Sequence, residues 1–283
     1  MLAPTVELLR AAQAGGYALG AFNVYNLEGV KAVVAAAQDA DSPVLLQIHP
    51  KALDYGGTPL IALCLAAAVN ASVPVAVHLD HSTSRDAIQA ALGAGVSSIM
   101  ADGSHLDYNA NVAFTAEMTR LAHEQGAAVE AELGKISGTE DGLTVAETAA
   151  RMTDPAQAAD FVAATGIDAL AVCIGNVHGP YPGEPRLDFD RLDAIRAVVE
   201  VPLVLHGTSG LPDALVQRAV ELGVCKFNVN TELRQAYVGA LGAAAGDLLD
   251  ILNRAVHAMQ DVVRAKITLF GSARKLPTNP KNV

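Results

Sequence analysis

Short apolar runs alternate with longer stretches of helical length along the whole chain. Eight of the runs predict strands, at 19–24, 44–48, 75–80, 97–101, 128–133, 169–174, 203–206 and 225–229. Strands of a parallel sheet are buried on both faces, so they are continuous apolar runs rather than alternating ones. The segments that predict helices are 27–40, 59–71, 84–94, 108–125, 155–165, 188–199, 212–222 and 233–245, followed by a final helix at 254–267.

The residues between these segments favour a parallel α/β fold. Gly95, Gly166 and Gly223 each stand just after a predicted helix and just before a predicted strand, where glycine readily ends a helix. Eight evenly spaced units without a break in composition predict one (β/α)8 TIM barrel over residues 1–283, with a polar tail at 272–283 that could be flexible. An open doubly wound sheet is the alternative, but its GxGxxG motif does not follow the first strand.

Composition narrows the choice of partners and compartment. Of the 283 residues, 51% are apolar, and the formal net charge is −11 without any Lys/Arg-rich run. A nucleic-acid surface needs clustered cations, so we expect no nucleic-acid partner, whereas a small phosphorylated ligand is compatible with the chain. Cys64, Cys173 and Cys225 lack CxxC spacing and are interpreted as buried thiols in a reducing compartment. The N-terminus lacks a signal-peptide pattern and the longest apolar run, 60–69, is short for a bilayer, so we expect a cytoplasmic protein without a membrane partner.

Nearly all unusual polar residues follow the carboxyl ends of the predicted strands. In a TIM barrel these ends form the mouth of the active site, so side chains from different strands can converge there. In chain order the set is Asn23, Asn26, Gln47, His49, His78, Asp80, His81, Asp102, Glu130, Glu132, His178, His206, Ser209, Lys226, Asn228, Asn230 and Thr231.

Three histidines of this set predict a metal site. His81, His178 and His206 come from three different strands, and three neutral imidazoles with one open position are typical of catalytic zinc. A single such histidine is more simply explained as a loop residue, but three on one rim with carboxylates between them favour a metal. Asp80 could move a proton to or from a metal-bound hydroxyl. It could instead cap a helix, although the hydroxyl residues at 82–84 suit that role better.

Two further carboxylates lie on the same rim. Asp102 and Glu132 could anchor the histidines or form an alternative metal position, and either could instead cap a helix. His78 stands two residues before Asp80 and so shares its face of the strand, where we expect it to pack or to support the site.

Glycines and small polar residues after the last strands predict a phosphate site. Backbone amides at a helix N-terminus are the usual phosphate cradle of a barrel, and ordinary turns with the same composition are the alternative. The residues are Gly179, Gly207, Ser209, Asn230 and Thr231.

After the fifth strand, residues 135–142 form a polar, glycine-containing segment that we expect to be a mobile lid, and Glu140 on it could be a second proton-transfer group.

Seven stretches, in order, resemble the class II zinc-dependent ketose-bisphosphate aldolases, which include fructose-bisphosphate and tagatose-bisphosphate aldolase. They cover roughly residues 19–271 and are jointly far more specific than any one of them. The stretches are AFNVYN, VAVHLDHS, SSIMADGS, VEAELGKISGTEDG, GNVHGPY, LVLHGTSGLP and KFNVNTELR.

The resemblance implies a lyase that cleaves a phosphorylated ketose to dihydroxyacetone phosphate and an aldehyde through a zinc-stabilised enediolate. Zn²⁺ would be held by His81, His178 and His206, with Glu132 and Asp102 close by. Asp80 would shuttle the proton of the C4 hydroxyl, and Glu140 would exchange the proton of the dihydroxyacetone phosphate carbon. Gly179, Gly207, Ser209, Asn230 and Thr231 would cradle the phosphate beside a monovalent cation (Na⁺ or K⁺), with Asn228 on the hydroxyl or carbonyl side and Asn23 and His49 as further substrate contacts. Family members are homodimers or homotetramers.

The chain departs from the family where the aldehyde would bind. Members generally carry a Ser shortly after the Gln that ends the second strand, and here the run is Gln47-Ile-His-Pro-Lys51. Many also have an Asp-Pro-Arg before the last helix, whose Arg reaches a neighbouring subunit's substrate, and here the stretch 247–249 has no arginine. We therefore expect an aldehyde other than glyceraldehyde 3-phosphate, with His49, Lys51 and Arg254 as candidate contacts.

Three other functions stay open on the sequence. A class I aldolase would use a lysine Schiff base, and Lys226 lies on a predicted strand. A metal-dependent hydrolase would usually carry a His-x-His pair on an early strand, which the chain lacks. A non-catalytic barrel subunit is disfavoured because the candidate catalytic residues are intact.

Overall fold

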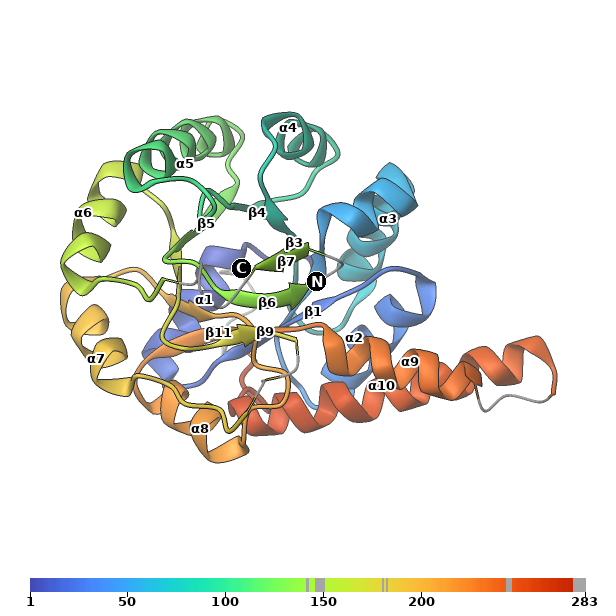
Figure 1. Cartoon of the computed structure of the whole chain (residues 1–283). Coiled ribbons are helices and arrows are strands. Elements are labelled where there is room, and N and C mark those ends of the chain that lie inside the picture. The colour runs from blue at the N-terminus through green and yellow to red at the C-terminus, as the bar shows by residue number, and fades with distance from the viewer. Residues whose placement is uncertain (141–142, 146–150, 180, 182, 243–245, 277–283) are drawn as a thin grey trace.

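Eight parallel strands close into a barrel in the order β1-β11-β10-β8-β5-β4-β3-β2, with helices around it (Figure 1). The computed structural model describes residues 1–140, 143–145, 151–179, 181, 183–242 and 246–276. The predicted (β/α)8 barrel is confirmed. Its strands are β1 Leu19–Asn23, β2 Val44–Ile48, β3 Val75–Ser82, β4 Ser98–Ala101, β5 Ala128–Leu133, β8 Ala169–Val172, β10 Leu203–Leu205 and β11 Val224–Val229.

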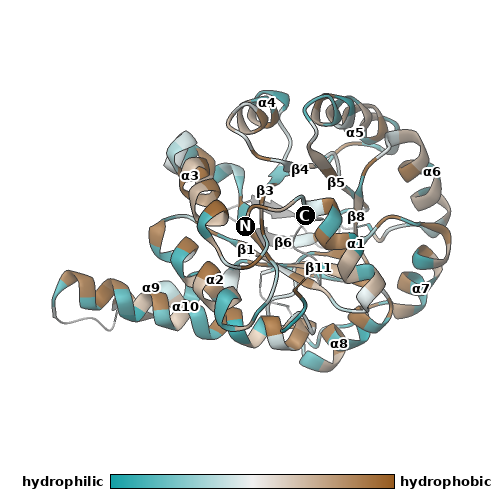
Figure 2. Cartoon of the chain, turned by 180° about the vertical axis from the view of Figure 1, so that it is seen from behind, coloured by the Kyte–Doolittle hydropathy of each residue, from teal (hydrophilic) through white to brown (hydrophobic). Residues whose placement is uncertain are grey.

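Helices follow the strands much as the apolar pattern predicts, and two of them extend beyond the ring. In Figures 1 and 2, α9 and α10 lie side by side and project from the barrel, and α10 alternates hydrophobic and hydrophilic residues, as a helix with one buried face does. The helices are α1 Thr5–Gly15, α2 Leu27–Asp39, α3 Pro50–Asn70, α4 Arg85–Gly93, α5 Tyr108–His123, α6 Pro155–Thr165, α7 Phe189–Val198, α8 Asp213–Glu221, α9 Thr231–Gly242 and α10 Leu248–Phe270.

The helix after the second strand begins earlier than predicted. It starts at Pro50, directly after its N-cap His49, and is kinked at Gly57, whose φ of 60° and ψ of −164° are not helical. Among the described residues α3 is the one helix long and apolar enough to cross a membrane by length and composition. It packs against β2 and β3, as a helix of a barrel does.

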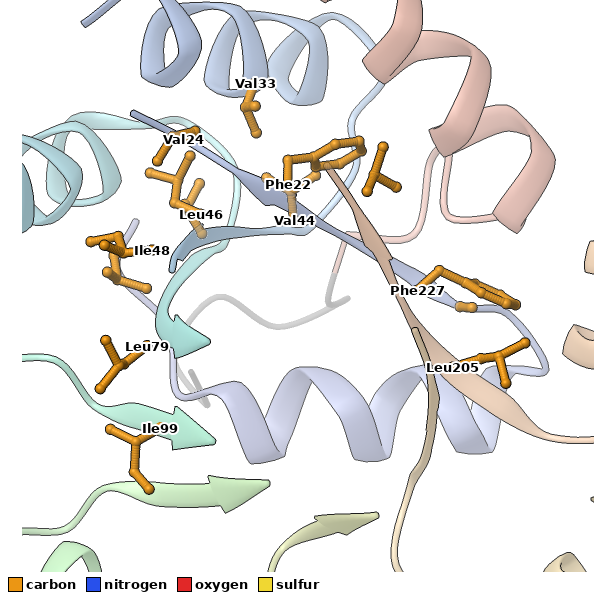
Figure 3. Close-up of a cluster of buried hydrophobic side chains, with 14 of the residues drawn as sticks. Phe22, Val24, Val33, Val44, Leu46, Ile48, Leu79, Ile99, Leu205 and Phe227 are labelled. Atoms are coloured by element: carbon orange, nitrogen blue, oxygen red, sulfur yellow. The ribbon is translucent and has the colours of Figure 1, made fainter. Parts of the chain in front are cut away.

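Two apolar cores lie on opposite sides of the strands. The larger fills the space between barrel and helices, where Phe22, Leu46 and Phe227 are fully buried (Figure 3). The smaller lies inside the barrel at its N-terminal end, where Leu19 and Leu45 meet residues of α1. The sequence pattern missed α1, which closes this end of the barrel.

A three-stranded sheet, β7-β6-β9, lies across the other end of the barrel (Figure 1). Its strands are β6 Ser137–Glu140, β7 Leu143–Val145 and β9 Val177–His178. Part of the segment predicted as a loop therefore forms β6, which pairs in parallel with β9 and antiparallel with β7. The mobility of this segment stays a prediction, and residues 141–142 lie outside the described residues.

The first residues of the predicted tail are attached to the barrel. Ser272 is fully buried, and its hydroxyl hydrogen-bonds that of Ser42 at 2.9 Å. The backbone N–H of Arg274 donates to the carbonyl of Ala40 at 2.9 Å. Residues 277–283 lie outside the described residues.

Leu9→Ala tests whether α1 is part of the core. Leu9 is 2% exposed, so we expect the substitution to lower the free energy of unfolding by about 2–5 kcal/mol. Leu249→Ala is the matched control, because this leucine is 66% exposed and should change stability by less than about 0.5 kcal/mol. Urea unfolding of both variants measures the difference, and equal small effects would show that α1 does not contribute to the core.

Candidate active site

Polar side chains form a layer inside the barrel, above the smaller apolar core. Residues two apart on a strand share a face, so each strand that places one polar side chain inward can place a second. The buried members are Asn23, Gln47, His78, Asp80, Ser98, Asp102, Glu130, Glu132, His206, Lys226 and Asn228.

Two histidines at the centre of this layer face each other. The Nε2 of His81 lies 2.8 Å from the Nδ1 of His206. The other nitrogen of His81, Nδ1, hydrogen-bonds Asp102 at 2.8 Å, and the Nε2 of His206 hydrogen-bonds Glu130 at 2.8 Å. A carboxylate only accepts, so each ring keeps its proton on the outer nitrogen and directs a lone pair toward the other ring. Two lone pairs at this distance need a positive charge between or beside them, which a shared proton or a metal cation can supply.

His178 completes the cluster from a different element. It ends β9, and its ring centre lies 5.2 Å from that of His81 and 6.1 Å from that of His206. Each of the three rings offers one nitrogen within 4.8 Å of the others. The structure therefore brings together the three histidines that the sequence predicted as metal ligands.

The backbone at the end of β3 lets two consecutive side chains reach the site. Pairing between β3 and β4 shifts register between Leu79 and Ser82, and His81 adopts a φ of 36°, in the left-handed region. Such a bulge turns the chain so that neighbouring residues no longer point to opposite faces. Asp80 and His81 consequently both face the cluster, with Oδ1 and Nε2 3.9 Å apart.

The pKa values of Asp102 and Glu132 are shifted in opposite directions, although the two carboxyl groups are neighbours. Burial alone would raise the pKa of Asp102, but the hydrogen bonds from His81 and Ser104 outweigh it and hold that pKa well below its usual value. Burial, reinforced by the negative charge of Asp102, raises the pKa of Glu132 to about 8. The Oε2 of Glu132 is buried and has no hydrogen-bond partner among the described residues.

A divalent metal fits this set of residues. His81, Asp102 and Glu132 form a second group of donors within 4.8 Å, which shares His81 with the histidine cluster. A cation would neutralise the facing imidazole lone pairs and give the unpartnered Glu132 oxygen a charge to face. The structure therefore brings together the residues of both the histidine position and the alternative carboxylate position, and occupancy by a metal stays a prediction.

Asp80 is held as a carboxylate by two amides. Asn23 donates through Nδ2 to Oδ2 at 3.0 Å, and Asn228 donates through Nδ2 to Oδ1 at 3.2 Å. Burial would raise the pKa of Asp80, but the positive charge that His81 and His206 can carry outweighs it and keeps the pKa below its usual value. A buried carboxylate with fixed oxygens can accept a proton from a group placed beside it.

Lys226 is occupied by two partners below Asp80. Its Nζ lies 2.8 Å from the Oε2 of Glu130 and 2.7 Å from the Oδ1 of Asn228, and its side chain is fully buried. A Schiff-base lysine must lose its proton and attack a carbonyl. Because this ammonium is ion-paired beneath the cluster, the structure disfavours the class I route.

The glycine-rich turns after the late strands meet beside the cluster. Gly207, at φ 63°, packs so closely on the carbonyl of Val177 that a Cβ would collide with it. Tyr181 donates to the carbonyl of Gly207 at 2.8 Å, and Gly179, at φ 80°, follows His178 directly. Only glycine tolerates both the left-handed conformation and this approach.

The remaining predicted phosphate contacts belong to two other loops. Asn230 is buried immediately before α9, and its Oδ1 accepts from the hydroxyl of Tyr25 at 2.8 Å. Thr231 is the first residue of α9, where backbone N–H groups are available to an anion. Ser209 is half-buried in the loop before α8. These placements agree with a phosphate site, whose occupant stays a prediction.

The predicted aldehyde contacts are placed differently from one another. His49 is buried with its ring centre 6.3 Å from that of His81, so it belongs to the mouth. Its Nδ1 accepts from the backbone N–H of Lys51 at 3.2 Å, and Lys51 is exposed at the start of α3. Arg254 is exposed on α10 rather than at a strand end. Glu140 ends β6, and its side chain lies outside the described part of the structure.

Sequence reasoning assigned no role to several residues that organise the site. Glu130 holds His206, Gln47 donates to the Oδ1 of Asn23 at 3.0 Å, and Ser98 hydrogen-bonds the Nδ1 of His78 at 2.7 Å. The available signal was the strand period, because Glu130 stands two residues before Glu132 and shares its face. Burial lowers the pKa of His78 to about 3, so that ring is neutral, in agreement with its expected supporting role.

Fold and site together define a barrel enzyme whose histidine cluster can hold a divalent metal at the carboxyl ends of the strands. The family model of the class-II fructose-bisphosphate aldolases matches residues 3–275. The chain belongs to this family, and it is therefore an aldolase, a lyase.

Solved structures agree with this assignment. The YdjI aldolase from Escherichia coli K12 is 37% identical with a TM-score of 0.90, over 98% of this chain and 100% of that one. A protein from Coccidioides immitis, provisionally described as a fructose-1,6-bisphosphate aldolase, is 35% identical with a TM-score of 0.91, over 95% and 96%. Fructose-bisphosphate aldolase from Campylobacter jejuni shares the fold, at 22% identity and a TM-score of 0.80, over 97% of each chain.

The raised pKa of Glu132 predicts a pH dependence of the metal-free protein. A carboxyl whose pKa is higher folded than unfolded stabilises the fold below the unfolded value, and that stabilisation is lost as pH rises through the folded value, here about 8. Between about pH 6 and about pH 9, chelator-treated wild type should lose more thermal stability than Glu132→Gln. Glu184→Gln, at an exposed glutamate, is the control and should follow the wild type. Parallel curves for wild type and Glu132→Gln would contradict the raised pKa.

Proposed function

We propose that this aldolase cleaves a ketose 1-phosphate to dihydroxyacetone phosphate and an aldehyde at a zinc site formed by His81, His178 and His206. The observation that carries the proposal is the pair of imidazole nitrogens held 2.8 Å apart by outer carboxylates, next to the buried carboxylate of Asp80. When bound, zinc would supply a Lewis acid for negative charge that develops on the ketose oxygens.

Asp80 would act as the base in the cleavage. As the C3–C4 bond breaks, the C4 hydroxyl becomes the aldehyde and must lose its proton. Both oxygens of Asp80 are fixed by Asn23 and Asn228 in a buried setting, so the carboxylate needs little reorganisation to accept that proton. In the reverse direction the same group would return the proton.

The phosphate of dihydroxyacetone phosphate would be bound by the turns after the late strands. Gly179 and Gly207 bring backbone close to the cluster, and the N-terminus of α9 supplies N–H groups that attract an anion. Ser209, Asn230 and Thr231 would add polar contacts. A monovalent cation, Na⁺ or K⁺, beside this phosphate is part of the proposal, because the family resemblance implies it.

The aldehyde half would differ from that of ordinary family members. Ketose 1-phosphates that release an aldehyde other than glyceraldehyde 3-phosphate are the favoured substrates, and fructose 1,6-bisphosphate and tagatose 1,6-bisphosphate are the alternatives. His49 stands where members generally have a serine, and its Nδ1 is committed as an acceptor to the N–H of Lys51. A neutral ring therefore carries its proton on Nε2, which makes it a hydrogen-bond donor suited to a hydroxyl or carboxylate oxygen.

Assembly as a homodimer or homotetramer and location in the cytoplasm stay predictions.

Proton exchange of dihydroxyacetone phosphate tests the function without knowledge of the aldehyde. Wild type loaded with zinc should exchange a proton of the hydroxymethyl carbon of dihydroxyacetone phosphate, the carbon that becomes C3 of the ketose, with deuterium oxide. The exchange is measured by NMR, and EDTA should abolish it. His206→Ala should lose at least about 100-fold in rate, because it removes one predicted ligand. His123→Ala is the control, since this histidine pairs with Asp168 on the surface and should leave the rate unchanged.

The same assay distinguishes the alternative routes. Exchange that resists EDTA, together with covalent trapping of dihydroxyacetone phosphate on Lys226 by borohydride, would contradict the metal-dependent mechanism. No exchange at any zinc concentration would contradict the proposed activity as a whole.

His49→Ser tests the altered aldehyde half. Cleavage of a panel of phosphorylated ketoses should show a preferred substrate for wild type, and His49→Ser should lower kcat/KM for it by about 10–100-fold, as expected for a lost hydrogen bond in a buried site. Exchange of dihydroxyacetone phosphate should change less than about 3-fold, because this half is bound elsewhere. His123→Ser, at the surface histidine that pairs with Asp168, is the matched control and should change neither rate. Equal loss in both assays would show that His49 supports the whole site rather than the aldehyde.

A further inference from the structure

Lys226 lies between a carboxylate that holds the histidine cluster and an amide that holds the proposed base. Its Nζ contacts both oxygens of Glu130, at 3.1 and 2.8 Å, and the Oδ1 of Asn228 at 2.7 Å. Glu130 continues to the metal-binding cluster through His206, and Asn228 continues to the proposed base, Asp80. The Lys226 side chain is fully buried between Glu130 and Asn228, so solvent does not compete for these contacts.

The contact with Asn228 determines which way that amide faces. An ammonium only donates, so the Asn228 atom next to Nζ must be the carbonyl oxygen. The amide nitrogen is then directed to the Oδ1 of Asp80, as observed at 3.2 Å. Without Lys226 the buried Oδ1 of Asn228 would lose this donor, and the amide would be held from the Asp80 side only. On the other side, Gln47 does the same for Asn23, whose Oδ1 accepts from Gln47 and whose Nδ2 donates to Asp80.

The contact with Glu130 has a separate effect on the histidine cluster. Glu130 lies 2.8 Å from the Nε2 of His206, and by accepting that N–H it leaves the Nδ1 lone pair of the ring for a metal. In a fully buried setting, an isolated carboxylate is strongly disfavoured unless a positive charge pairs with it. Lys226 is that charge, and it lies opposite His206 on the same carboxylate.

We propose that Lys226 is a positioning residue that fixes the Asn228 amide toward Asp80 and keeps Glu130 available to His206. It does not touch the reacting atoms, and it acts through its two partners. The proposal rests on the proposed function for the role of Asp80, whereas the effect on metal binding is independent of the substrate.

Lys226→Met is the first variant, because methionine is similar in length and can neither donate nor carry charge. We expect zinc affinity to fall by about 10–100-fold, as is usual when a residue that orients a metal ligand is lost. We expect kcat for the ketose phosphate that wild type cleaves fastest to fall by at least about 10-fold. Lys31→Met, at an exposed lysine of α2, is the matched control and should alter neither value. Zinc affinity is measured by competition with a chromogenic chelator.

A double variant separates the two effects and covers the case in which Lys226→Met fails to fold. In Glu130→Gln with Lys226→Met no buried charge lacks a partner, and the amide oxygen of Gln can still accept from His206. Thermal stability should therefore recover toward that of wild type, and zinc affinity should return to within about 3-fold of the wild-type value. Nothing then donates to the Oδ1 of Asn228, so kcat should stay at least about 10-fold below wild type.

Two outcomes would overturn the proposal. If the double variant regains kcat together with stability, Lys226 serves only as the counter-charge of Glu130. If Lys226→Met has the zinc affinity and the kcat of wild type, Lys226 does not position Asn228 or Glu130. Failure of the proposed function is recognised separately, because wild type would then show no cleavage or exchange while the zinc affinities of the variants could still be compared.

Discussion

The short approach between His81 and His206 is the constraint on which the site depends. Each ring has its outer nitrogen engaged by a buried carboxylate, so both inner nitrogens are acceptors directed at the same small volume, 2.8 Å apart. Such an arrangement is unfavourable without a positive charge, which a shared proton or a cation can supply, and the third ring, His178, with a nitrogen within 4.8 Å of the other two, favours a metal. The raised pKa of Glu132 and the strained backbone at His81 are consistent with the same requirement.

The barrel tolerates this density of charge because almost every charge in it is paired. Glu130, for example, contacts both Lys226 and His206, and it lies 4.0 Å from the Nε2 of His78. Buried ion pairs stabilise a fold little, since desolvation offsets their attraction, and removal of one partner is strongly unfavourable. Stability must therefore come from the apolar cores on either side: the layer between barrel and helices, and the smaller cluster closed by α1. The charged layer is retained for what it positions.

The sequence predicted the strands and the ring of polar residues at their ends because both depend on local pattern: continuous apolar runs, glycine at helix ends and chemistry where a run stops. It did not predict that Lys226 pairs with Glu130 or that Gln47 orients Asn23. Those contacts depend on how residues from different strands meet inside a closed barrel, which no single segment contains. The helix α1 and the β6–β9 pairing were missed for related reasons, since each depends on what the segment covers.

Closure of the barrel is itself part of the catalytic arrangement. The last strand, β11, pairs with the first, β1, in a register that sets Ala21 opposite Asn228. Asn23, two residues further along β1, therefore lies near Asn228, and the two amides can bind opposite oxygens of Asp80. A sheet open at this seam would leave the base with one amide and would separate Lys226 from the N-terminal half of the site. The eight-stranded closed topology is thus required for the position of one proton-accepting group, in addition to its role in stability.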